Sequence, residues 1–175
     1  GLTYSASRTS APGTTSPGDA MNTPLPIRRK VLAYITHGNR LLVFRHSHFP
    51  EAGIQVPAGT VGLDEDPDDA ALREAVEETG LENLTLDQFL GEQTRDMSEY
   101  GRGEIHHRRF YHVRCVATPP DTWRHVERHP SDGAEPIAFD FFWVPLPRGV
   151  PPIAGDQDAL LCRLLDTLGL PAVRA

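Results

Sequence analysis

The acidic residues concentrate in one stretch, residues 59–81, which reads GTVGLDEDPDDAALREAVEETGL. Within it, Glu74, Glu77 and Glu78 follow the spacing i, i+3 and i+4, so a helix would make their carboxylates neighbours. Carboxylates crowded in this way repel each other, and Arg73 supplies only one positive charge. Mg²⁺ and Mn²⁺ prefer such oxygen ligands. On spacing alone two interpretations stay open, an exposed acidic helix face and a site for divalent cations.

The same stretch predicts a helix over about residues 67–79. Asp66 is a good N-cap and Pro67 suits the first helical position. Gly80 suits the left-handed residue that follows a helix. At about 100° per residue, one side of the helix is expected to face the core and the three glutamates the other side. The expected core face comprises Leu72, Ala75, Val76 and Thr79.

Together with its preceding glycine loop, the stretch resembles the Nudix box. That motif is Gly, five residues, Glu, seven residues, Arg-Glu, an aliphatic residue, any residue, Glu-Glu, any residue, Gly and an aliphatic residue. The matching positions are Gly59, Glu65 and the run Arg73-Glu74-Ala75-Val76-Glu77-Glu78-Thr79-Gly80-Leu81. Ala75 is small for the aliphatic position. The flanking segments are also similar to the family, so the resemblance spans roughly residues 28–170.

This resemblance implies a Nudix hydrolase, which cleaves a diphosphate bond in a nucleoside diphosphate linked to another group. The implied cofactor is Mg²⁺ or Mn²⁺. By position, Glu74 and Glu78 resemble the principal metal ligands and Glu77 a further one. The backbone carbonyl at Gly59 often joins them in the family. The remaining implied roles are orientation of the glutamates by Arg73 and support at the entrance of the motif by Glu65.

The proton acceptor for the attacking water stays open between two parts of the chain. Glu74 is one candidate, and in the family the base also comes from a later loop. The acidic residues of that loop here are Glu127, Asp132 and Glu135. A non-catalytic Nudix-like module that senses a nucleotide is the alternative function, although such modules generally have an eroded motif.

The substrate is expected to be a small nucleotide-type diphosphate, and no marker outside the motif selects one. Nucleoside triphosphates, dinucleoside polyphosphates and nucleotide sugars all stay open. Arg45, His46 and Arg109 are the candidate substrate-binding residues. Arginine suits phosphate oxygens and the histidine could line the substrate cleft, whereas surface side chains without this role are the alternative for all three. The resemblance is also compatible with a homodimer.

The composition limits the partners. The formal net charge of −7 argues against broad binding to nucleic acid or to anionic membranes. No apolar run approaches the roughly 18 residues of a membrane span, and no secretory signal is evident. Cys115 and Cys162 lie in apolar contexts and are expected to be buried thiols. We therefore expect a cytoplasmic protein.

The remaining pattern predicts an α/β (α+β) fold with a mixed β-sheet between α-helices. We expect a disordered tail over residues 1–26, rich in Ser, Thr, Pro and Gly, and one domain over residues 27–172. Residues 1–20 precede Met21 either as an added leader or as native sequence. Strands are expected over 29–36, 40–45, 54–62, 84–93, 106–117 and 136–146, and a second helix over 156–169.

Overall fold

The computed structural model describes residues 23–128 and 135–172 of the 175-residue chain. Most of the tail expected over 1–26 lies outside these residues, as does Asp132. Residues 23–26 are exposed and lie in no helix or strand.

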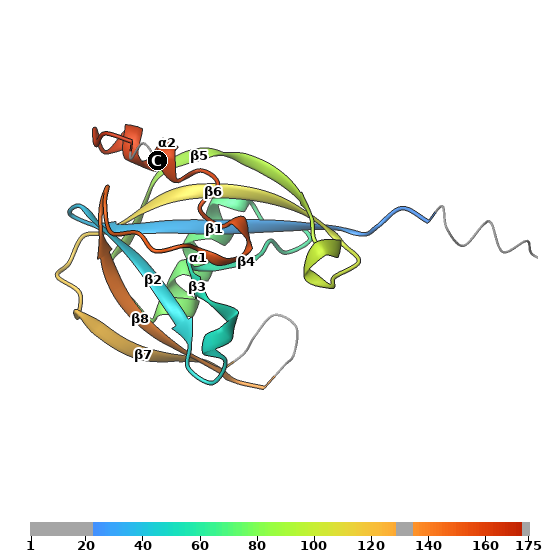
Figure 1. Ribbon diagram of the computed structural model, residues 1–175, viewed down its shortest axis with the longest axis horizontal. Helices are drawn as coiled ribbons and strands as arrows, with labels where there is room; N and C mark the ends of the chain where they lie inside the picture. Colours follow the sequence, from blue (N-terminus) through green and yellow to red (C-terminus); the bar gives the residue numbers. More distant parts are fainter. Residues whose placement is uncertain (1–22, 129–134, 173–175) are drawn as a thin grey trace, which may run out of the picture.

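An eight-stranded mixed sheet forms the centre of the molecule (Figure 1). Its main path runs β5-β6-β1-β2-β8-β7, with β3 paired to β2 and β4 paired to β1. Only the β1–β6 pair is parallel among the pairs of the described chain. The strands are β1 (Ile27–His37), β2 (Arg40–His46), β3 (Ile54–Gln55), β4 (Ala58–Thr60), β5 (Leu84–Asp96), β6 (Ile105–Cys115), β7 (Thr122–Glu127) and β8 (Ile137–Pro145).

One edge of β1 is shared between two partners. Near the end of β1, Thr36 and His37 pair with the start of β2. Nearer its beginning, the same strand pairs with β4, with Lys30 opposite Thr60 and Val31 opposite Gly59. β4 therefore lies in the space where β2 and β1 diverge, and this arrangement brings the start of the acidic motif into the sheet.

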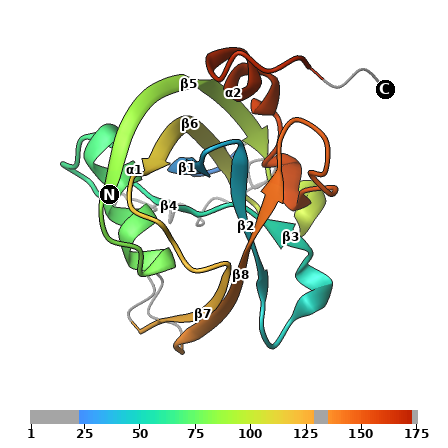
Figure 2. The ribbon, with the colours of Figure 1, turned by 90° about the vertical axis from the view of Figure 1, so that its left-hand side faces the viewer.

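The two helices, α1 (Pro67–Thr79) and α2 (Leu161–Thr167), cover opposite faces of the sheet (Figure 2). Ala70, Ala71 and Ala75 of α1 belong to one buried cluster with alternate residues of β1. Leu164 and Leu165 of α2 belong to a second cluster. The predicted mixed sheet between helices is confirmed. None of the helices in the described residues is long and apolar enough to cross a membrane.

The predicted strands are present with ends shifted by at most three residues, except that 54–62 divides into β3 and β4, and β7 was not predicted at all. β7 alternates between exposed and half-buried residues at the sheet edge, so its sequence carries little apolar signal. The second helix is shorter than 156–169, because Asp156 has a positive φ of 57° and residues 157–160 form turns before α2 begins at Leu161. The side chain of Asp156 accepts a hydrogen bond from Gln93 Nε2 (2.7 Å) and pairs with Arg95 (3.2 Å), which fixes this turn.

The expected core face of α1 is wrong in part. Val76 is 42% exposed, whereas Glu74 and Glu78 are buried at 3% and 5% exposure. The small side chains of the alanines let α1 approach β4 closely, so that the glutamates turn towards the sheet. Of the two expected buried thiols, Cys115 is buried and Cys162 is exposed.

Candidate active site

The helix that carries the glutamates begins and ends where the sequence predicts. The Asp66 side chain accepts a hydrogen bond from the backbone N–H of Asp68 (2.8 Å), and Pro67 occupies the first turn. Gly80 follows the helix with φ 71°, a conformation that favours glycine. These two caps determine where α1 begins and ends, and the packing of α1 against the sheet determines which side chains face β4.

Glu74 lies directly against β4. A Cβ placed on Gly59 would be 2.0 Å from Glu74 Cδ, so the absence of a side chain at Gly59 makes room for this carboxyl group. The backbone of β4 and the carboxylate of Glu74 thus meet without an intervening side chain. Such a contact allows a backbone carbonyl of β4 and the carboxylate of Glu74 to coordinate the same cation.

Arg73 connects the acidic residues of the motif. Its Nη1 donates to Glu74 (2.9 Å) and Glu77 (3.1 Å), and its Nε and Nη2 donate to the two carboxylate oxygens of Glu65 (2.7 and 2.8 Å). Nη2 also donates to the Thr60 carbonyl (3.2 Å). Hydrogen bonds from Arg73 lower the pKa of Glu65 to about 2. One guanidinium therefore fixes the side chains that flank the site.

Glu78 is buried beneath β4. Its Oε2 accepts a hydrogen bond from the backbone N–H of Ala58 (3.3 Å). Burial, followed by the charge of Glu127, raises the pKa of Glu78 well above its ordinary value. Burial also raises the pKa of Glu74, against the effect of Arg73. The ionised forms of Glu74 and Glu78 are therefore unfavourable in this buried site without a counter-charge. A bound cation would supply that counter-charge.

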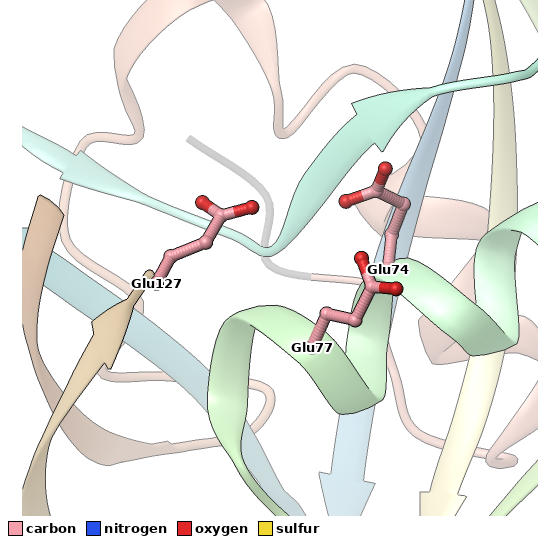
Figure 3. A group of neighbouring side chains, drawn as sticks. All are labelled: Glu74, Glu77 and Glu127. Atoms are coloured by element: carbon pink, nitrogen blue, oxygen red, sulfur yellow. The ribbon is translucent and has the colours of Figure 1, made fainter. Parts of the chain in front are cut away.

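Glu127 enters the site from β7, a strand remote in sequence from α1. Carboxylate oxygens of Glu74, Glu77 and Glu127 all lie within 4.8 Å of one another, close enough to share one metal ion. Figure 3 shows Glu127 extending from the end of β7 towards the two glutamates of the helix. The sequence offered Glu127 only as a weak candidate base, because β7 and its position beside α1 were not predicted.

The donor set fits a hard divalent cation. It consists of carboxylate oxygens, with a backbone strand that approaches Glu74 without a side chain at Gly59. Glu78, which the motif predicts as a principal ligand, is not among these three carboxylates and accepts the hydrogen bond from Ala58 instead, so its role as a ligand stays a prediction. The residues present therefore suit Mg²⁺ or Mn²⁺.

Two adjoining clefts, each of about 530 Å³, open beside this acidic group. The first is lined by Glu74 and Glu127 together with Arg28, Lys30, Arg102 and Glu104. The second extends over the face of the sheet that carries α2, and its lining combines apolar and polar groups, including Leu32, Met97, Tyr100, Gln55, Arg108 and Gln157. Three acidic residues line the first cleft and none lines the second, whose charged groups are all basic, so the two surfaces differ in the sign of their charge.

The three candidate substrate-binding residues, Arg45, His46 and Arg109, do not line these two clefts. Arg45 is exposed on β2 and its guanidinium lies 4.8 Å from the ring centroid of Phe142. His46 packs edge-on against Phe49 and Phe139. These two side chains line neither of the two clefts, and their substrate contacts stay predictions.

Arg109 lines a smaller cavity of about 280 Å³, which shares Lys30 and Arg108 with the second cleft. It donates to Glu92 and to the hydroxyl group of Tyr111 (2.9 Å). Glu135 is another loop residue that the sequence offered as the proton acceptor. It is exposed and is not one of the three clustered carboxylates of Glu74, Glu77 and Glu127.

Apart from Arg102, the lysine and arginines that line the clefts lie in two basic segments of the sequence. These segments are RRKV (28–31) and HHRR (106–109), on the parallel pair β1 and β6, where Lys30 is opposite Arg108. On a strand, alternate residues share a face. Knowledge of that pairing was needed to select Lys30 and Arg108 from their neighbours.

Comparison with known proteins supports the fold. The solved MutT NUDIX hydrolase from Burkholderia pseudomallei is 21% identical with a TM-score of 0.56, covering 79% of this chain and 98% of that chain. A solved UDP-X diphosphatase is 16% identical with a TM-score of 0.56, covering 89% and 68%. An ADP-ribose pyrophosphatase from Streptococcus suis is 17% identical with a TM-score of 0.51, covering 83% and 92%.

A comparison with curated protein sequences returned no match. The family model described as NUDIX domain, in contrast, matches residues 26–163, which is most of the chain. These residues include the whole acidic motif, the β-sheet and the start of α2. The chain therefore belongs to the Nudix family of pyrophosphohydrolases.

Proposed function

We propose that this protein is a Mg²⁺- or Mn²⁺-dependent hydrolase of a nucleoside diphosphate linked to another group. Water attacks at phosphorus, and the bond between that phosphorus and the bridging oxygen breaks. The observation that carries this proposal is the meeting of Glu74 and Glu77 with Glu127, three carboxylates from two distant segments. Such a concentration of negative charge needs a cation, and a diphosphate is the kind of ligand that shares one.

Five groups would hold the cation: the carboxylates of Glu74, Glu77, Glu78 and Glu127 and the backbone carbonyl of Gly59. When bound, the cation neutralises charge on the diphosphate and lowers the pKa of the attacking water. Arg73 holds Glu74 and Glu77 in place, and Glu65 in turn holds Arg73. This network keeps the carboxylates oriented without occupying all of their oxygens.

The water must lose a proton during its attack, and a carboxylate accepts it. Glu74 and Glu127 both line the first cleft, so both lie where a substrate would bind. Exchanging either carboxylate for an amide removes the acceptor and keeps the shape. Glu127→Gln therefore tests whether β7 contributes to the reaction, either as a cation ligand or as the proton acceptor.

Cleavage of a nucleotide panel, with Mg²⁺ or with EDTA, tests the proposal when the two phosphate-bearing products are separated by chromatography. The panel should contain nucleoside triphosphates, dinucleoside polyphosphates and nucleotide sugars. On the best substrate, Glu78→Gln and Glu127→Gln should each lower kcat/KM by at least about 100-fold, because several kcal/mol of metal assistance are lost. Glu82→Gln, at an exposed position after α1, is the matched control and should retain the activity.

The outcomes separate the two functions considered. Full activity of Glu78→Gln would show that the metal-ligand assignment is wrong. Nucleotide binding without Mg²⁺-dependent cleavage of the diphosphate bond in the wild type would instead indicate the sensing module. The homodimer and the cytoplasmic location stay predictions.

A further inference from the structure

We propose that Lys30 binds a phosphate group of the substrate at the junction of the two clefts. This inference rests on the proposed function, because it takes the substrate to be a diphosphate. Lys30 would contact the diphosphate directly, independently of the glutamates that hold the cation. This residue lies outside the acidic motif.

The position of Lys30 is the first argument. Four residues line both clefts, namely Lys30, Ala58, Gly59 and Arg102. Lys30 is paired with Thr60 across β1 and β4, so its neighbour on β4 is next to Gly59. A phosphate group that lies between the acidic group and the second cleft must therefore pass beside Lys30.

The hydrogen-bonding capacity of Lys30 is the second argument. An ammonium group donates three hydrogen bonds. Lys30 Nζ donates one of them to Thr60 Oγ1 (2.7 Å), and in the described part of the chain no carboxylate lies within 4.0 Å of it. The arginines nearby are engaged differently: Arg28 pairs with Glu104 (3.3 Å), and buried Arg108 donates to the Gly155 carbonyl (2.6 Å). Lys30 thus retains donors that phosphate oxygens can accept.

The chemical type of the residue is the third argument. Lys30 is the only lysine among 17 basic residues. Its half-buried ammonium is a compact point charge, whereas a guanidinium is a broad plane that would need more room beside Thr60. Desolvation makes such a charge unfavourable unless an anion approaches it. Arg102, whose side chain is 65% exposed, can contact the same group from the solvent side.

The experiment measures binding instead of turnover. The probe is methylenediphosphonate, a diphosphate analogue that resists hydrolysis and carries no base or sugar. Its Kd is measured by calorimetry for the wild type, Lys30→Met and the charge-matched control Arg114→Met, in Mg²⁺ and in EDTA. Arg114 is exposed on β6 and pairs with Asp87 (3.4 Å), away from both clefts.

Lys30→Met should weaken binding of the probe by roughly 10- to 100-fold, the loss expected for hydrogen bonds to a charged group. Arg114→Met should stay within about twofold of the wild type, since exposed charges are screened by salt. Lys30→Gln keeps a polar group for Thr60 and is the second variant. If the methionine variant does not fold, the ratio of the Kd of Lys30→Gln to the Kd of the wild type is used instead. Lys30→Arg should restore binding only in part.

Equal Kd values for the wild type and the two neutral variants would overturn the role of Lys30. That result is distinguishable from failure of the proposed function, which would appear as hydrolysis independent of Mg²⁺ or of Glu78. A Lys30 variant that lost affinity only to the extent of Arg114→Met would also overturn it, because a general charge effect would then suffice.

Discussion

The carboxyl group of Glu74 occupies the place where a side chain at position 59 would lie. A Cβ on Gly59 would be 2.0 Å from Cδ and 2.3 Å from Oε2 of Glu74, distances that no pair of non-bonded atoms sustains. Position 59 is therefore restricted by packing, and its glycine and the buried acid form one unit. The same contact brings the backbone of β4 beside the acidic group.

Replacing Gly59 by alanine should displace Glu74 from this position. A displacement of about 1 Å can lower activity by roughly 100-fold, and we expect a loss of that order in kcat/KM with the fold retained. Gly103→Ala is the control, because the nearest atom to a Cβ there is 4.0 Å away. Steady-state kinetics and thermal unfolding of both variants check the prediction. Equal activity of Gly59→Ala and the wild type would contradict the steric coupling.

Arg73→Lys should disrupt the acidic group although the charge is kept. The guanidinium donates from three nitrogens to Glu65, Glu74, Glu77 and the Thr60 carbonyl, and a lysine has one nitrogen. We expect metal affinity or activity to fall roughly 10- to 100-fold, as for other residues that orient ligands. Mn²⁺ titration calorimetry measures the affinity. Arg163→Lys, on α2, is the control, and a similar loss in that variant would argue against a specific role of Arg73.

The stability of the metal-free protein should depend on pH through Glu78. Burial raises the pKa of Glu78 well above its ordinary value, so between those two values the folded chain binds more protons than the unfolded chain. The free energy of unfolding therefore falls as the pH rises through this interval. Glu78→Gln removes this titration. In EDTA, the Tm of Glu78→Gln minus the Tm of the wild type should therefore increase as the pH rises from about 5 to about 8.

Mg²⁺ should oppose this trend in the wild type, because cation binding requires ionised carboxylates and strengthens as the pH rises. Thermal unfolding at the two pH values, with Mg²⁺ and with EDTA, gives the four measurements needed. A Tm difference between Glu78→Gln and the wild type that did not change with pH would show that the pKa of Glu78 is not raised.

The orientation of α1 predicts a small effect at position 76 and a large one at position 75. Val76 is 42% exposed, so Val76→Lys should change the free energy of unfolding by no more than about 0.5 kcal/mol. Ala75 is fully buried, and Ala75→Leu should destabilise the fold by about 1–3 kcal/mol through overpacking. Urea unfolding of the metal-free protein measures both values. A large loss in Val76→Lys would instead support the core face expected from the helical periodicity.

Local interactions explain what could be predicted from the sequence. Residues within one turn of each other determine where α1 begins and ends, and Asp66, Pro67 and Gly80 therefore predicted 67–79 correctly. The motif from Gly59 to Leu81 is also contiguous, so it identified the family without knowledge of the fold. The alternation of strands and helices was sufficient for the mixed sheet between helices.

Contacts between distant segments decided the rest. Helical periodicity separates two faces of α1 but does not state which one turns to the sheet, and the glycine and alanines that admit Glu74 and Glu78 are recognised only once β4 is in place. β7 has little apolar signal of its own and is fixed by pairing with β8, so Glu127 could not be placed beside Glu74 from the sequence. Tertiary structure alone brings these carboxylates together, because loop closure over about 50 residues is determined by packing and not by local preference.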